Sequence, residues 1–406
     1  MSILVGSGFS IPEGLPGIQK LNKQLSKINE SEIQIDSTQR AKFLKGQEDF
    51  NSHSGWYEKK FIQEFLEFYN TEILKPNNED FHYETFYDYY TGFLINNEKD
   101  KRVESFCNRF NDKYFKDDQN SKDPIRWIFE FDKTFSQLLA SQLKRSKYFD
   151  AESIKQHPPY DTFIGFLKDL IETCDIKFHT LNHDLFFDWL GQNHEDLKQY
   201  YSDGFQLEDS SFYGKAQCKI KSGNIVFEPH SVKLRYFTEK FDKPLSFFKL
   251  HGSIDNIIPN AIDSDNEILR IKTNYSVTRY QKKIGDHSFE ELMEDVKPDF
   301  LSGTTNKIRF YNSDPYYKKL FEHFKINLLS SELLIVIGYG FQDDRINEFL
   351  ETYFLSQGKN MIIIDPGKLK SDLFCKYNPL QIQKSIIDIT YQEFLEQILL
   401  KFNIIQ

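Results

Sequence analysis

The chain of 406 residues is 39% hydrophobic and 16% aromatic, which provides a real core and excludes a disordered chain. A formal net charge of −10 at pH 7 argues against a protein that binds nucleic acid non-specifically through a basic surface. No apolar run approaches the roughly 20 residues that span a membrane, and residues 1–5 already read as a strand, so we expect neither a membrane segment nor a cleavable leader. The four cysteines form no C-x-x-C pair and suit a reducing, cytoplasmic location without disulfides.

The first predicted element is a short strand, Ile3 to Val5, and the glycine-rich turn GSGFSIPEGLP follows it at once. From about residue 17 to 173 the pattern is helical, with little strand signal. Apolar side chains recur at helical spacing in 61–69, and Asp123-Pro124 is a typical helix start. Residues 17–173 therefore read as a large helical insertion.

Strands return in the second half of the chain. Short apolar runs at 176–181, 245–250, 332–338 and 360–365 are typical of strands covered on both faces. Helical patterns at 315–330, 343–356 and 391–402 alternate with the last two of these runs. The fold class that we predict is α/β, a Rossmann-like parallel sheet built from 1–16 and 174–406. The stretch 201–300 is harder to read from its pattern.

Glycine-rich or polar turns follow four of the predicted strands, and such turns meet at one edge of a parallel sheet. They are Gly6-Ser7-Gly8, Asn182-His183-Asp184, His251-Gly252-Ser253 and Gly338-Tyr339-Gly340. This arrangement predicts a ligand site at that edge.

Each turn also has a purely structural interpretation. Gly6 to Gly8 could cradle a diphosphate or could simply be a tight turn. A side chain at Gly8 would block the ligand without unfolding the protein in the first case, and would cost stability in the second. Asp184 could cap a helix instead of taking part in catalysis, and His251 could be a general base or a hydrogen-bonded structural histidine. His179 and His183 have metal-ligand spacing only on a helix, so we expect no metal site there.

Taken in order, these segments resemble the sirtuin family. Gly6-Ser7-Gly8-Phe9-Ser10 with Gly14-Leu15-Pro16 is similar to the family's opening G-A-G-[IF]-S and G-[IL]-P. Thr180 to Asp184 is similar to T-x-N-x-D, and Lys249 to Ser253 to the catalytic H-G-[ST] segment. Gly338 to Phe341 stands where the family has G-T-S, and Ile364-Asp365 where it has Ile-Asn.

The departures from the family pattern also carry information. No D-F-R follows Gly14-Leu15-Pro16, and the zinc-binding cysteine pairs of the deacylases are missing. The run G-Y-G-F-x-D-D-x-x-N, 338–347, resembles the divergent sirtuin domains of bacterial antiphage defence. Those domains hydrolyse NAD, and some act with a HerA-type ATPase.

The resemblance implies an NAD hydrolase that depletes NAD during antiphage defence, in an abortive infection. It implies the catalytic residues Asn182, His251 and Asp184, and no metal. The residues implied to bind NAD are Gly6, Ser7, Gly8, Phe9, Ser10, Gly338, Gly340 and Asp365. The implied partners are NAD, further copies of the chain and a HerA-type ATPase or other defence protein, with 17–173 serving assembly or as a lid. A protein deacylase and a non-catalytic NAD-sensing subunit stay open as alternatives.

Overall fold

The computed structural model describes residues 1–36, 40–44, 55–95, 100–115, 121–149, 152–219, 227–259, 268–273, 277–286, 288–292, 297–303 and 313–401. The chain divides into two compact units. Unit 1 comprises Met1–Leu15, Lys144–Met293 and Tyr311–Gln406, and unit 2 comprises Pro16–Leu143 and Glu294–Phe310. The helical insertion was expected at 17–173, whereas unit 2 begins at Pro16, leaves residues 144–173 to unit 1, and also includes Glu294–Phe310.

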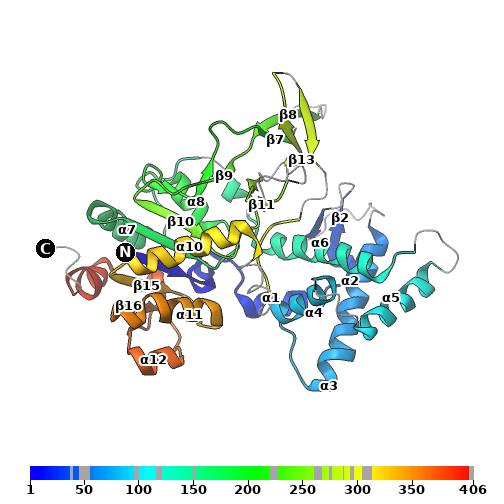
Figure 1. Ribbon diagram of the computed structural model, residues 1–406, viewed down its shortest axis with the longest axis horizontal. Coiled ribbons are helices and arrows are strands. Elements are labelled where there is room, and N and C mark those ends of the chain that lie inside the picture. Colours follow the sequence, from blue (N-terminus) through cyan, green and yellow to red (C-terminus); the bar gives the residue numbers. More distant parts are fainter. Residues whose placement is uncertain are drawn as a thin grey trace. The chain divides into compact units, whose positions relative to one another are not determined.

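Unit 1 is built on a seven-stranded parallel sheet (Figure 1). Its strands, in spatial order, are β17 (Leu380–Ile382), β16 (Asn360–Ile364), β15 (Leu333–Ile337), β1 (Ser2–Val5), β4 (Ile176–Thr180), β10 (Leu245–Lys249) and β5 (Tyr201–Ser202). The predicted Rossmann-like α/β class is confirmed. The first strand lies between β15 and β4, so residues at the N-terminus pair with segments far along the chain.

Helices cover both faces of this sheet. They are α7 (Asp161–Thr173), α8 (Phe186–Asn193), α10 (Pro315–Ser330), α11 (Asp344–Tyr353), α12 (Asp372–Tyr377) and α13 (Tyr391–Phe394). On β4 the ring of Phe178 lies 3.9 Å from Phe187 of α8, and the ring of His179 lies 4.8 Å from Phe324 of α10. Because successive strand residues point to opposite faces, α8 and α10 cover opposite sides of the sheet.

Residues 201–292, which the pattern did not resolve, contain two four-stranded sheets. The first is formed by β6 (Gly204–Gln206), β9 (Tyr236–Lys240), β11 (Asn256–Ile257) and β12 (Ile271–Lys272). The second is formed by β7 (Phe212–Lys219), β8 (Phe227–Lys233), β13 (Val277–Lys283) and β14 (Phe289–Leu292). The described strands of both sheets pair antiparallel to their neighbours.

Unit 2 is mainly helical. Its elements are α1 (Ile18–Leu25), β2 (Ile33–Ile35), β3 (Ala41–Phe43), α2 (Trp56–Phe68), α3 (Lys75–Asn77), α4 (Tyr83–Ile95), α5 (Lys101–Tyr114) and α6 (Pro124–Leu143). Aromatic side chains fill its core: Phe61 stacks on Trp127 at 4.8 Å, and Phe65 and Phe86 pack against Phe131. The helix start expected at Asp123-Pro124 is confirmed, since the Asp123 carboxylate accepts a hydrogen bond from the amide of Arg126.

Candidate functional site

The strands of the parallel sheet end in register. Val5 pairs with Thr180 on one side and with Ile337 on the other, Thr180 pairs with Lys249, and Ile337 pairs with Ile364. These five residues form one row across the sheet. The segments that follow them therefore leave the sheet at the same edge, which is where ligands bind in open α/β folds.

The turn after β1 is fixed by Asn182, which follows β4. The Asn182 side-chain nitrogen donates to the carbonyl oxygen of Gly6 and to Ser10 Oγ, both at 3.0 Å. Because a carbonyl can only accept, these contacts set the orientation of the amide and occupy both of its hydrogens. The Asn182 oxygen remains as an acceptor for a ligand or a water molecule.

The backbone of Gly338 leaves no space for a side chain at Gly8. A Cβ atom at this position would lie 2.7 Å from Cα of Gly338, and a Cβ on Gly6 would lie 2.6 Å from the carbonyl oxygen of Gly338. Gly338 itself has φ of 60°, in the left-handed region that favours glycine. The geometry favours the tight-turn interpretation for Gly8, so a side chain there should cost stability.

Phe9 and Ser7 lie in opposite environments. The Phe9 ring is buried among Tyr160, Phe163, Phe178 and other aromatic rings at 5.5–6.0 Å. Its side chain therefore serves the core, and a direct contact with a ligand could come only from its backbone. Ser7 is exposed at the start of a short 3-10 turn, Ser7–Phe9.

Glu13 and Gly14 link the end of the same turn to Arg145, Lys147 and His157, and no sequence motif predicts these contacts. The carboxylate of Glu13 lies 2.7 Å from Nε2 of His157 and forms an ion pair with Lys147, and Arg145 donates to the carbonyl oxygen of Gly14 at 3.3 Å. Burial raises the pKa of Glu13, but the hydrogen bonds from His157 and Lys147 outweigh burial and leave that pKa lowered.

Asp184 is buried directly after Asn182 and His183. Its carboxylate accepts from the amide of Phe186 at 2.9 Å and from the hydroxyl of Ser10. Burial raises its pKa, although the charge of Lys249 opposes that shift. Asp184 thus links the β4 turn both to α8 and to the β1 turn, which suits an orienting role better than direct chemistry.

His251 is buried two residues beyond the end of β10. Its ring centre lies 6.2 Å from that of His183, and its Nε2 lies 3.5 Å from a carboxylate oxygen of Asp343. The amide of Ile254 donates to the carbonyl oxygen of His183 at 3.1 Å, which joins the His251 turn to the Asn182 turn. Gly252, with φ of 76°, makes the intervening reversal possible.

Two further predicted residues follow the neighbouring strands. Gly340 is exposed, and a Cβ added to it would meet nothing nearer than Gln342 Cγ at 3.8 Å. Asp365 is half-buried after β16, where its carboxylate accepts from the amide of Gly367 at 2.7 Å and burial raises its pKa. The row of strand ends thus places all the predicted turns at one edge.

A buried network of charged side chains, which was not among the predicted site residues, reaches this edge of the sheet through Lys249. Asp188 of α8 lies 2.8 Å from both Lys249 and Lys272, and Lys272 also lies 3.6 Å from Asp203 and 3.4 Å from Asp255. Lys249 donates as well to the carbonyl oxygen of Asp184. No local motif signals such a network, because its members come from five separate segments.

His179 has no role at the edge. It is fully buried against Phe248 and Phe324, and burial lowers its pKa to about 3, so it stays neutral.

Among the described residues no group of three or more His, Cys, Asp or Glu side chains could hold a metal ion. In the same part of the chain, no helix has the length and apolar character needed to cross a bilayer.

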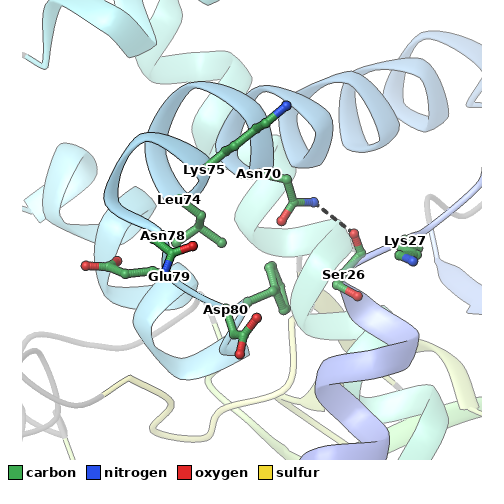
Figure 2. A pocket seen from close by; sticks show the side chains of 9 residues that line it. Ser26, Lys27, Asn70, Leu74, Lys75, Asn78, Glu79 and Asp80 are labelled. Atoms are coloured by element: carbon green, nitrogen blue, oxygen red, sulfur yellow. Dashed lines mark hydrogen bonds between the residues drawn. The ribbon is translucent and has the colours of Figure 1, made fainter.

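A pocket of about 480 Å³ lies in unit 2 and contains none of the predicted site residues (Figure 2). It is lined by Ser26, Lys27, Asn70, Leu74, Lys75, Asn78, Glu79, Asp80 and Phe81. Asn70 donates to the carbonyl oxygen of Ser26 at 3.0 Å across it. Most of the lining side chains are exposed.

No family model and no curated protein matches the chain. Solved structures that are similar include Sir2 with a p53 peptide and NAD+ (11% identity, 98% of this chain and 92% of the other, TM-score 0.33). A Sir2 homologue in complex with ADP-ribose is 10% identical, over 100% of this chain and 94% of the other, with a TM-score of 0.37.

Proposed function

We propose that this chain hydrolyses NAD at the bond between nicotinamide and ribose. One observation carries the proposal: Asn182 and His251 follow the adjacent strands β4 and β10, and the hydrogen bond between Ile254 and His183 joins their two turns. The resemblance of both turns to the sirtuin segments T-x-N-x-D and H-G-[ST] supports the same assignment.

The edge offers groups that suit a dinucleotide. The exposed Ser7 and Gly340 leave room for a diphosphate near the glycine-rich backbone, and Asp365 can accept from ribose hydroxyls. Ser253, in the same turn as His251, is fully buried, and its Oγ has no hydrogen-bond partner among the described residues. A buried hydroxyl without a partner costs free energy, so this atom fits a bound ligand or an ordered water.

Asn182, His251 and Asp184 each take a separate role in the proposed hydrolysis. Hydrolysis consumes one water molecule and yields nicotinamide, ADP-ribose and one proton. The Asn182 oxygen accepts a hydrogen bond from the attacking water or a ribose hydroxyl, because its amide hydrogens are already engaged. His251 accepts the proton that the water or hydroxyl loses. Asp184 holds the Asn182 turn against Ser10 and α8.

A deacylase and an NAD-sensing subunit are the competing functions, and one experiment separates them from a hydrolase. Purified protein is incubated with NAD, with and without an acyl-lysine peptide, and free nicotinamide is followed by chromatography. A hydrolase releases nicotinamide without the peptide, a deacylase needs it, and a sensor binds NAD without turnover. Candidate partner proteins are included, so that an enzyme awaiting its trigger is not scored as a sensor.

The biological setting that we propose is antiphage defence by depletion of NAD in the cytoplasm. The run from Gly338 to Asn347, which resembles divergent sirtuin domains of such systems, is the feature that supports it. In this proposal the helical residues of unit 2 mediate self-assembly or binding of a HerA-type ATPase, or serve as a lid. Substitutions on exposed helix positions that leave oligomer size and partner binding unchanged would favour the lid.

A further inference from the structure

Asp343 brings a carboxylate to the buried ring of His251. Its Oδ2 lies 3.5 Å from Nε2 of His251, while Asp343 stands at the start of α11 and His251 follows β10. The two residues are far apart in the sequence, and β10 and β15 are separated in the sheet by β4 and β1. The two side chains therefore meet only because four neighbouring strands end at the same edge of the sheet.

The position of Asp343 is strongly constrained. Its Oδ1 accepts from the amides of Arg345 and Ile346, both at 3.1 Å, so one carboxylate oxygen caps the helix while the other faces His251. The hydroxyl of Tyr339 lies 3.1 Å from the carbonyl oxygen of Asp343 and 3.2 Å from its amide nitrogen. Neither the carboxylate nor the backbone of Asp343 can turn away without loss of these contacts.

We infer that Asp343 is a positioning residue for His251. In the neutral imidazole one nitrogen carries a hydrogen and the other a lone pair. A carboxylate that faces Nε2 favours hydrogen on this nitrogen, which leaves Nδ1 as the atom that takes a proton. When His251 becomes imidazolium, the carboxylate of Asp343, 3.5 Å from Nε2, stabilises the new charge. This inference rests on the proposed function only for the identity of the reaction; the tautomer itself is independent of it.

The direct test is nitrogen NMR of the full chain with isotope-labelled histidine. The His251 resonances are assigned by their loss in His251→Gln. We expect wild-type His251 to carry hydrogen on Nε2. In Asp343→Asn the amide can donate to Nε2 and still cap the helix, because Asn and Asp are equally good caps. The ring should then shift to the form with hydrogen on Nδ1. A wild-type ring protonated on Nδ1, or an unchanged ring in Asp343→Asn, would overturn the inference.

Kinetics provide the second readout, with Asp344→Asn as the matched control. Asp344 is the next residue, exposed on the first turn of the same helix, and loss of its charge changes the helix end without touching the carboxylate at His251. Asp343→Asn should lower kcat at least about tenfold, part of the roughly 10²–10⁴-fold that a general base contributes, with KM changed much less. Asp344→Asn should stay within about threefold of wild type on the same scale. An equal loss of kcat in both variants would mean that Asp343 acts only as a helix cap.

The two readouts separate this inference from the function on which it rests. If wild-type protein releases no nicotinamide but the tautomer depends on Asp343, the positioning stands and the proposed reaction fails. If nicotinamide is released but neither the His251 tautomer nor kcat changes in Asp343→Asn, the proposed reaction is supported and the positioning role of Asp343 is contradicted. Thermal melts of each variant confirm that the protein is folded in every comparison.

Discussion

The amide nitrogen of Gly8 donates to the carbonyl oxygen of Gly338 over 2.9 Å, and the two glycines meet backbone to backbone. This contact joins the turn after β1 to the turn after β15. It shows why a glycine stands at position 8: the space that a side chain would need is taken by Gly338.

Gly8→Ala should therefore destabilise the protein. The new Cβ would lie 2.7 Å from Gly338 Cα, and backbone cannot move aside as a flexible side chain can. We expect a loss of about 1–3 kcal/mol in the free energy of unfolding, measured by denaturant titration. A variant as stable as wild type would contradict the backbone packing.

Gly340→Val tests ligand approach at the same edge with little effect on folding. The position is exposed, and a Cβ there meets only Gln342 at 3.8 Å, so the free energy of unfolding should change by less than about 0.5 kcal/mol. If the 338–341 turn contacts NAD, the added methyl groups should raise KM about tenfold or more, equivalent to about 1.4 kcal/mol of binding. An unchanged KM in this folded variant would remove Gly340 from the ligand site.

Asp188 should make stability depend on pH in the acid range. Burial raises its pKa, but Lys249 and Lys272 dominate and lower it to about 2. Its unfolded pKa is about 3.9, so the stabilisation is fully present above that value and is lost as the pH falls from about 4 to about 2.

The measurement compares wild type with Asp188→Asn by denaturant unfolding between pH 6 and the lowest pH at which both fold. The difference in unfolding free energy should contain a pH-dependent part of about 2–3 kcal/mol that shrinks below pH 4. A difference that is constant across the acid range would mean that Asp188 is not held ionised by the two lysines.

We also expect that the reaction needs no zinc. The four cysteines form no C-x-x-C pair, and three of them, Cys107, Cys174 and Cys375, are free thiols in the described residues. Nicotinamide release should survive incubation with a chelator, and elemental analysis should find far less than one zinc per chain. A zinc content near one per chain, lost together with activity on chelation, would revive the deacylase alternative.

The strands that carry the site could be predicted because each is a short, uninterrupted apolar run. β4, β10, β15 and β16 all lie within the predicted runs. β5 and β17 have only two and three residues, too few for a periodic signal. The antiparallel strands of 204–292 could not be predicted, because they are short or carry many polar residues, as in YFTEK of β9.

The order of strands and turns along the chain was enough to predict that the site residues lie at one edge. The role of each residue depends on interatomic distances, which only the structure provides. The close contact between Gly8 and Gly338 could not be predicted, because the two residues are remote in sequence. Phe9 looked like part of a binding motif, yet its ring completes an aromatic core. The contact between His251 and Asp343 depends on four strands in register, which no local pattern encodes.

Cleavage of NAD by the purified chain, compared among wild type, Asn182→Ala and His251→Ala, tests the central claim most directly. Asn182→Ala also removes two hydrogen bonds to the β1 turn, so its stability should fall by about 1–3 kcal/mol, and assays are run well below its melting temperature. Nicotinamide and ADP-ribose are quantified together, with candidate partner proteins present. The account predicts equimolar products from wild type and a loss of at least about 100-fold in each folded variant. Turnover near the wild-type rate in either variant, or no cleavage by wild type under any of these conditions, would contradict it.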